Sequence, residues 1–403
     1  MNWRLMLALG ALLLAPATAA QEDLSVRTAQ VDDLTAVRQI KHLQARWGHM
    51  AMAGNWAGMA DMATDDVVMV LPVPAVGRAA LEQSLRNRQG HGVDGMPAGR
   101  LNIRLYISPV ITLAPDGQSA TGRWHHIAMT GEIGGEAGWI GTTDVIGYRL
   151  TAKGWKIAHI RPYLQFSGDY SSGWSHDAAT LERAPYHYTP DEAGMLLPLP
   201  RTTAPRDATT LEQQARRLLA QSLAQNTVSA YGYYLDRGMV DDAADLFAAD
   251  ALIEQGGQGS WAGAGGVSRF LTRFGEPRLD HGELADRLQL MPMTNVASDG
   301  SMALVRNVEL AMTGQHGCQG QWQVSMQTFL LRPDAAGHWR IAQMHHNPIM
   351  RADHAAGWTD PLPAALPIMP GGEPTGETRL GPVDFRDSAY GVPPLGESLF
   401  MPP

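Results

Sequence analysis

The sequence predicts an α+β fold built twice from one repeated unit. The stretch from Trp47 to Val70 combines an apolar-periodic helix, a break at Gly54, a second short helix and a strand that opens after Asp66. The same order recurs 184 residues later, from Tyr231 to Glu254. A register kept over a long distance indicates an internal duplication, which decides the architecture. Further matches, at offsets of 183 or 184, are Arg104 with Arg287, Pro109 with Pro292, Asp116 with Asp299, Trp139 with Trp322, Trp155 with Trp339, and Trp174 with Trp358.

In the first copy, apolar periodicity predicts three helices and then a set of strands. Asp33 is the expected cap of a helix that runs to about Ala53, with apolar side chains at three-residue steps on one face. A short helix is expected over 56–62 and an amphipathic helix over 78–89, with a strand over 67–70 between them. Alternation and turn residues then predict four antiparallel strands, over 104–113, 120–130, 139–150 and 155–165.

The second copy repeats this order through Met350, starting from a helix over 211–237 for which Thr210 is the expected cap. Helices that precede a run of hairpin strands are typical of an α+β domain. We expect the following organisation: a signal peptide over 1–20, a first domain over 31–174, a linker over 175–208, a second domain over 209–358, and an extended tail rich in proline and glycine over 359–403.

The first twenty residues resemble a secretory signal. Arg4 provides a positive start, Leu5 to Ala15 is apolar but too short to span a bilayer, and Ala17 to Ala20 forms a small-residue cleavage site. The sequence therefore predicts export across the inner membrane, to the periplasm, and no membrane attachment after cleavage. The mature chain has one cysteine, Cys318, so an internal disulfide is excluded and packed cores must supply the stability.

Composition indicates a globular, core-forming protein. The hydrophobic fraction is 44%, the charged fraction is 18%, and the formal net charge is −9. A mildly acidic chain argues against nucleic acid or an anionic membrane as the main partner. The sequence has no P-loop, dinucleotide fingerprint, Gly-x-Ser-x-Gly elbow or paired-cysteine metal site. We therefore expect no cofactor and no metal, which leaves acid/base chemistry or plain binding.

The first helix of copy two carries a candidate acid/base group. Tyr231 and Tyr234 share a helix face, and Asp236 lies at the C-terminal end of the helix. The helix dipole raises the pKa of a carboxylate at that end, so Asp236 becomes a usable general acid or base if it faces a cavity. The alternative is a solvated Asp236 paired with Arg237.

Two further groups are candidates on strands. Asn307 and Glu309 alternate with apolar residues and share one strand face, which is either a pocket lining or a solvent-facing side. His345 and His346 are adjacent on a strand and point to opposite faces, so joint binding of one metal is disfavoured, and one of them lining a pocket is the better reading. His281 is either a loop residue or a pocket residue. Trp322 is expected in a core, or stacked on an aromatic ligand.

These residues together resemble the SnoaL-like branch of the nuclear transport factor 2-like superfamily. The resemblance rests on Tyr231, Asp236 and Gly238, Asp250 at the start of a strand, Asp299-Gly300, and Trp339-Arg-Ile, with a parallel set in copy one. It implies that each copy is a cone, in which helices wrap a curved antiparallel sheet around an apolar pocket. It also implies dehydratase, isomerase or other lyase activity on aromatic, polyketide or steroid-like molecules, without a cofactor.

The resemblance carries Tyr231 and Asp236 onto the tyrosine and aspartate of the family's first helix. Copy one has Trp47 and Met52 at these positions, so its pocket is expected to lack that acid/base group. The histidine that many relatives carry on the strand after the third helix falls at Arg104 and Arg287.

We therefore expect an exported, cofactor-independent lyase that acts on a small hydrophobic, possibly aromatic substrate in the second domain. Asp236 would move the proton, Tyr231, Tyr234 and Asn307 would hold an oxygen, and Arg287 would stabilise developing negative charge. Glu309 or His345 would be the complementary acid, and Trp322 and His281 complete the expected substrate contacts. The alternative is a periplasmic binding or scaffold protein. The first domain would pair with the second as a built-in dimer, and the chain could assemble further as a homo-oligomer.

Overall fold

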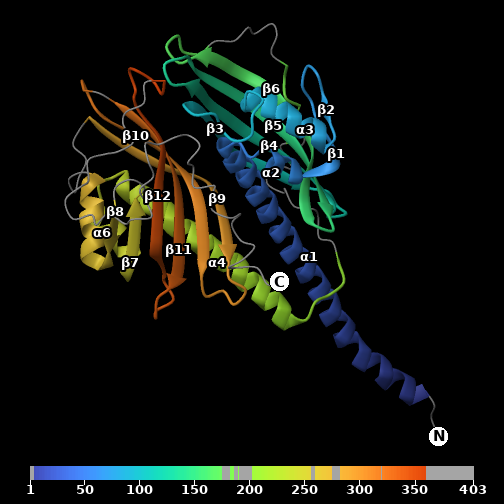
Figure 1. Cartoon of the computed structure of the whole chain (residues 1–403). Coiled ribbons are helices and arrows are strands. Elements are labelled where there is room, and N and C mark those ends of the chain that lie inside the picture. Colours follow the sequence, from blue (N-terminus) through green and yellow to red (C-terminus); the bar gives the residue numbers. More distant parts are fainter. Residues whose placement is uncertain are drawn as a thin grey trace.

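The computed structural model describes residues 4–174, 182–185, 189, 202–255, 259–274, 282–318 and 320–359, with side chains from residue 21 onward and without that of Glu22. Two six-stranded sheets, each accompanied by helices, lie side by side (Figure 1). The expected α+β fold in two copies is confirmed. The expected tail falls outside the described residues after Thr359, and the described parts of the linker have no regular secondary structure.

The first repeat begins with a long helix and ends with a meander of long strands. Its sheet has the order β2-β1-β6-β5-β4-β3, in which β1 runs parallel to β6 and the other neighbours are antiparallel. The elements are α1 (Arg4–Ala53), α2 (Trp56–Asp61), β1 (Ala63–Met69), β2 (Ala75–Val76), α3 (Arg78–Gln89), β3 (Arg100–Leu113), β4 (Ser119–Glu132), β5 (Ala137–Thr151) and β6 (Gly154–Asp169).

The second repeat has the same topology, with the strand order β8-β7-β12-β11-β10-β9. Residues 183 or 184 apart therefore occupy equivalent places in the two sheets. The elements are α4 (Ala208–Leu235), α5 (Val240–Asp245), β7 (Phe247–Gln255), β8 (Gly259–Ala262), α6 (Gly263–Leu271), a 3₁₀ turn (Thr272–Phe274), β9 (Glu283–Val296), β10 (Ala303–Gln315), β11 (Gln321–Pro333) and β12 (Trp339–Asp353).

Both expected helix caps need correction. The structure shows α1 as one continuous helix from Arg4, so Asp33 lies inside it, 5% exposed, and does not cap it. The helix α4 begins at Ala208, and its cap is Asp207 rather than Thr210. The Asp207 carboxylate accepts the Thr210 backbone N–H at 2.9 Å and the Thr210 hydroxyl at 2.7 Å. A carboxylate satisfies the free N–H groups of a first turn better than a hydroxyl further along the helix can.

Each sheet has an outer face, which is turned toward the other repeat and away from its own helices. The two outer faces contribute to one apolar cluster. Leu101, Ile103 and Leu105 alternate along β3 with the polar Asn102 and Arg104, and all three leucine and isoleucine side chains are buried. On the other sheet, the outward-facing residues Val308, Val324, Met326 and Met350 are buried in the same cluster. Because the side chains of a strand alternate between faces, packing of the outer faces directs the intervening polar residues to the inside of each repeat.

An aromatic group at the seam breaks the symmetry of the repeats. Trp139 and Trp322 are equivalent positions, and their rings meet edge to face at 5.9 Å. Trp358 is buried, its ring lies 4.8 Å from that of Trp139, and its N–H donates to the Thr130 carbonyl at 2.8 Å. Its equivalent in the first repeat, Trp174, is 69% exposed. The end of the second repeat is therefore inserted into the first, without a reciprocal insertion.

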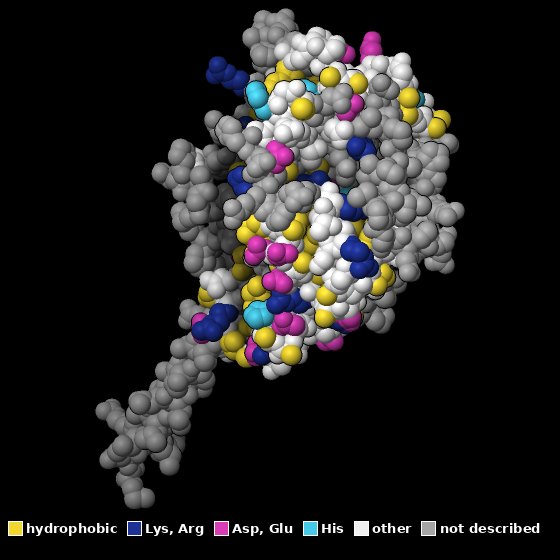
Figure 2. Space-filling view, turned by 90° about the vertical axis from the view of Figure 1, so that its left-hand side faces the viewer, with side chains coloured by type: hydrophobic (Ala, Val, Ile, Leu, Met, Phe, Trp, Pro, Cys, Tyr) yellow, Lys and Arg dark blue, Asp and Glu magenta, His cyan; other side chains and the backbone are white. Residues whose placement is uncertain are grey.

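The described helices include none with the length and apolar content needed to cross a membrane. On the face shown in Figure 2, acidic and basic side chains lie next to one another rather than in fields of one sign.

The two equivalent tryptophans give a direct test of the seam. Trp358→Ala should lower the free energy of unfolding by about 3–5 kcal/mol, since it removes a buried indole and its hydrogen bond. Trp174→Ala should change it by less than about 1 kcal/mol, as expected for an exposed side chain. Urea denaturation of both variants measures the difference, and equal effects would contradict the asymmetric insertion.

Candidate functional site

The inner face of the second sheet gathers polar side chains from four neighbouring strands. Asn307 on β10 lies opposite Gln327 on β11, which lies opposite His346 on β12, and Glu309 lies opposite Ser325. Residues directly opposite on antiparallel strands project to the same face. All of these side chains, together with Arg287 on β9, are at most 9% exposed. The strand register thus builds a buried polar layer that the spacing of single residues along the chain does not reveal.

Glu309 is the central group of this layer. Its side chain is fully buried, with Oε1 lying 3.5 Å from Nη1 of Arg287 and 3.6 Å from Nε2 of His346. The Gln327 amide donates to Oε2 at 2.8 Å. The Arg287 guanidinium also lies over the Phe274 ring, 4.3 Å from its centroid. A buried carboxylate is tolerated only when charge and hydrogen bonds compensate it, and Arg287 supplies the opposite charge.

Tyr231 enters the same interior from α4. Its ring meets those of Phe247 and Phe329 edge to face, with centroids 5.9 and 5.7 Å apart. Burial, reinforced by the negative charge of Glu309, raises the pKa of the Tyr231 phenol, so it stays protonated and is available as a hydrogen-bond donor. Burial also lowers the pKa of His346 to about 4, against the opposing pull of Glu309, so the imidazole is neutral at pH 7.

Several buried polar atoms of this interior have no hydrogen-bond partner among the described residues. Native interiors hold few such atoms, and a group of them marks a place where water or a ligand completes the hydrogen bonds. The atoms of this group all belong to the second repeat. They are Tyr231 Oη, Nε and Nη1 of Arg287, Asn307 Oδ1, Glu309 Oε1, Gln327 Oε1 and His346 Nδ1.

Asp236 lies at the end of α4, where it caps the helix against β9. Its Oδ1 accepts the backbone N–H of Arg287 at 2.6 Å. Partial burial raises the pKa of the Asp236 carboxyl, while this hydrogen bond opposes the rise. The residue is half-buried rather than bathed in solvent, and its contact is with the backbone of the strand that carries Arg287.

The structure places the other expected site residues apart from this layer. His345 is partly exposed and pairs with Glu254 at 2.7 Å, so the imidazole beside Glu309 belongs to His346 and not to His345, because neighbours on a strand face opposite ways. Trp322 lies at the seam, where its N–H donates to the Tyr170 hydroxyl at 3.0 Å. Tyr234 is half-buried and packs against the apolar core of the second repeat. His281 lies outside the described residues.

The first repeat has no tyrosine or aspartate at the two helix positions, as expected, but its sheet contains other ionisable groups. Its helix positions are apolar, Trp47 and Met52, but its sheet supplies a chain of polar side chains. The Thr142 hydroxyl donates to Asp144 Oδ1 at 2.5 Å and lies 3.0 Å from His126 Nδ1. Because that hydroxyl proton goes to Asp144, Nδ1 of His126 is the donor to Thr142, which leaves Nε2 as an acceptor. The Tyr106 ring stacks on His126 at 4.5 Å.

Burial raises the pKa of one group in this hydrogen-bonded series and lowers the pKa of another. It raises the pKa of Asp144 to about 6, and it lowers the pKa of His126 well below its usual value, with the nearby charge of Arg104 adding to the second effect. The expectations from the sequence did not include Thr142 or Asp144, and of the two adjacent histidines they gave the role of the acid to His345, whereas the structure places His346 beside Glu309. The register of the predicted hairpins was the signal that could have found them. Among the described residues, no three His, Cys, Asp or Glu side chains are placed to hold a metal.

The two adjacent histidines of β12 provide a matched pair for a stability measurement. The pKa of His346 falls from 6.5 to about 4, so between these values the unfolded chain binds more protons than the folded chain. Stability should therefore fall on acidification through this window, by at most about 3 kcal/mol from this group. His346→Gln should flatten the pH dependence of the melting temperature between pH 6.5 and 4, and His345→Gln should leave it as in the wild type. Equal slopes in all three proteins would refute the assignment.

A comparison with curated proteins finds no match. Three solved structures similar to part of the chain are a protein provisionally described as a scytalone dehydratase and an NTF2-like protein with a cystatin-like fold, both from Novosphingobium aromaticivorans, and a ketosteroid isomerase-like protein from Erwinia carotovora atroseptica. Their identities are 16%, 19% and 15%, and their TM-scores are 0.31, 0.30 and 0.28. They cover 34%, 35% and 32% of this chain, and 90%, 90% and 95% of their own.

The model of one protein family matches the chain twice. The SnoaL-like domain aligns with residues 32–161 and again with residues 216–345. The two matches carry the same order of helices and strands, and they coincide with the two sheets. The resemblance seen in the sequence is thereby confirmed, and the chain belongs to the SnoaL-like domain family as a tandem pair.

Proposed function

We propose that this protein is a cofactor-independent lyase or isomerase that acts by general acid/base catalysis on a small, largely apolar substrate. The observation that carries the proposal is the buried Glu309, flanked by Arg287 and His346 within 3.6 Å and accompanied by buried polar atoms that have no hydrogen-bond partner in the described part of the chain. Packing alone does not account for a carboxylate enclosed in this way, because its burial costs several kcal/mol of desolvation. Its neighbours His346 and Tyr231 have pKa values shifted by burial, and groups shifted in this way concentrate at functional sites.

The chemistry proposed is proton removal next to a carbonyl, followed by loss of a hydroxyl group or by return of the proton at another carbon. Glu309 accepts the proton, and Arg287 places a positive charge 3.5 Å from its carboxylate. The protonated Tyr231 hydroxyl and the Asn307 amide hold the substrate oxygen on which negative charge develops. When the hydroxyl group leaves, it takes a proton from the protonated Glu309 and departs as water, while the carbonyl re-forms. The neutral His346 imidazole lies 3.6 Å from that carboxyl group and helps to orient it. The apolar rings of Phe247, Phe274 and Phe329 around this layer favour an aromatic or alicyclic substrate.

Asp236 is the second proton-transfer group in this proposal. Its pKa is raised by burial and it is tied to the backbone of Arg287, so it can act without disturbing the charge balance around Glu309. Two carboxyl groups in different environments can divide the roles of acid and base between them.

A non-catalytic binding protein is the second candidate. The observation that favours it is the arginine, Arg104 or Arg287, which both repeats carry on the strand where many relatives carry a histidine. Export to the periplasm also remains a proposal, supported by the signal-like residues from Arg4 to Ala20, and fractionation of cells that express the full chain tests it.

Removing the charge of Glu309 should separate catalysis from binding. Glu309→Gln keeps the shape and the hydrogen bond to Gln327, but it removes the proton acceptor. We expect turnover of β-hydroxy ketones, and exchange of their α-protons in D₂O measured by NMR, to fall about 10²- to 10⁴-fold. Glu254→Gln is the matched control and should retain activity, because Glu254 pairs with His345 on the opposite face of the sheet.

Asp236→Asn distinguishes the two carboxyl groups. If Asp236 acts as the second proton-transfer group, its variant should slow turnover by about 10²-fold or more while Glu309-dependent α-proton exchange persists. If wild type binds the ketones tightly but neither turns them over nor exchanges their protons, and both variants bind equally well, the binding reading replaces the enzymatic one.

A further inference from the structure

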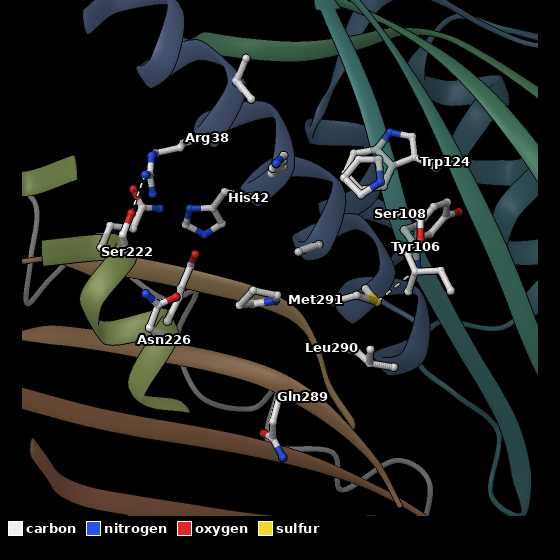
Figure 3. Close-up of a pocket in the computed structure, with 18 of the residues that line it drawn as sticks. Arg38, His42, Tyr106, Ser108, Trp124, Ser222, Asn226, Gln289, Leu290 and Met291 are labelled. Atoms are coloured by element: carbon white, nitrogen blue, oxygen red, sulfur yellow. Dashed lines mark hydrogen bonds between the residues drawn. The ribbon is translucent and has the colours of Figure 1, made fainter. Parts of the chain in front are cut away.

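A cavity of about 680 Å³ lies between the two repeats, where α1 and β3 of the first face α4 and β9 of the second. Figure 3 shows Arg38 and His42 projecting from α1 toward Ser222 and Asn226 on α4. Most of the lining residues are equivalent in pairs, so the cavity lies on the axis that relates the repeats. Three such pairs, at an offset of 184, are Arg38 with Ser222, Lys41 with Gln225, and His42 with Asn226.

The charge of this cavity has one sign, although the chain as a whole carries a net charge of −9. Arg38 and Lys41 line it, and no aspartate or glutamate is among its lining residues. Arg38 Nη2 donates across the seam to Ser222 Oγ at 2.6 Å. Among the described residues, neither Arg38 nor Lys41 has a carboxylate within the 4.0 Å of an ion pair. The cations are thus compensated by hydroxyl and amide groups and not by opposite charge.

Apolar side chains form another part of the cavity wall. Val37, Trp124, Leu290, Met291 and Pro292 contribute to it from both repeats. Its size lies in the usual range for small-molecule sites, about 300–1,000 Å³. A few cationic and amide groups on one side and a largely apolar wall on the other fit a ligand with an anionic head and a hydrocarbon body.

Backbone strain marks the same place in both repeats. Ser108 has a φ of 50° and Met291 a φ of 53°, values that side chains other than glycine rarely adopt. The two positions are equivalent, each lies at a register shift of its strand, and both line the cavity. The Tyr106 N–H donates to Met291 Sδ across the seam at 3.3 Å. Such bulges re-aim side chains near binding sites, and strained residues persist where the surroundings hold them.

We propose that the cavity between the repeats binds a small organic anion, a monocarboxylate with an aliphatic or aromatic body. Arg38 and Lys41 hold the carboxylate, the Gln225 and Asn226 amides donate additional hydrogen bonds, and the body of the ligand lies against Trp124 and Met291. The alternative, two solvated cations beside a packing defect, predicts no preference for an anionic ligand over a neutral one of the same size.

This site is separate from the one proposed for catalysis. Glu309, His346, Arg287 and Tyr231 do not line the cavity, and the cavity takes groups from both repeats, whereas the Glu309 cluster belongs to the second alone. The two proposals can therefore fail independently.

Calorimetric titration of the purified full chain with octanoate, and separately with 1-octanol, tests the proposal. We expect one octanoate per chain, with octanol at least tenfold weaker. Arg38→Gln and Lys41→Gln should each weaken octanoate binding roughly 10- to 100-fold, the worth of a hydrogen bond to a charged group. Quenching of Trp124 fluorescence, absent in Trp124→Phe, should accompany binding and place the ligand at this wall.

Two controls fix the interpretation. Arg216→Gln removes an equal charge from an exposed ion pair on α4 and should leave octanoate binding unchanged. Glu309→Gln should also leave it unchanged, which separates this site from the catalytic one. Equal affinity for octanoate and octanol in the wild type, or variants at Arg38 and Lys41 that melt like the wild type and bind octanoate equally well, would overturn the proposal.

Discussion

The packing of the two sheets through their outer faces is the interaction on which the rest of the molecule depends. Side chains alternate along a strand, so a strand that gives Val308 to the shared apolar cluster must direct Asn307 and Glu309 the other way. The other side of each sheet is covered by its own helices. The inward polar residues are therefore enclosed, and their cost is offset only where they meet charge or hydrogen bonds. Apolar contact at the seam thus creates the conditions for polar chemistry inside the repeats.

The two interiors use similar side chains in different places. Both keep an arginine at the same point, Arg104 and Arg287. Glu309 takes the place of His126, and Gln327 takes the place of Asp144, so the carboxyl group has moved from one strand to its neighbour. The first repeat consequently holds a hydrogen-bonded series from imidazole through hydroxyl to carboxyl, and the second a cluster in which the carboxyl group lies directly between an arginine and a histidine. Both repeats place an arginine near a buried carboxyl group. The other side chains around that carboxyl group, which could move a proton, differ between the repeats.

The helices reinforce this difference. Trp47 fills the interior of the first repeat, where the second has Tyr231 with its buried hydroxyl. Both the indole and the phenol carry a hydrogen-bond donor, and Trp47 uses its N–H on Tyr106, whereas only the phenol oxygen can also accept a hydrogen bond. The Tyr231 hydroxyl, by contrast, has no hydrogen-bond partner among the described residues.

The seam between the repeats shows what a fused pair can do and a homodimer cannot. A symmetric dimer presents the same residue from both sides of its axis. Here the axis passes between Arg38 and Ser222, and between Lys41 and Gln225, so one wall is cationic and the other neutral. Trp358 and Trp174 have diverged in the same way, one inserted and one exposed. Covalent linkage lets each half change alone, and it concentrates the asymmetry where the halves meet.

The sequence alone determined the duplication, the α+β class, the family, and most elements to within a few residues, because helix and strand periods are local properties of the chain. It also identified Glu309, Asn307, Tyr231 and Arg287 as residues of one candidate site. The tertiary structure decided which of two adjacent histidines accompanies Glu309, that Trp322 belongs to the seam, and that the first repeat carries Asp144 and Thr142 beside His126. These outcomes depend on strand register and on which sheet face is covered, and both are set by contacts between residues far apart in the chain.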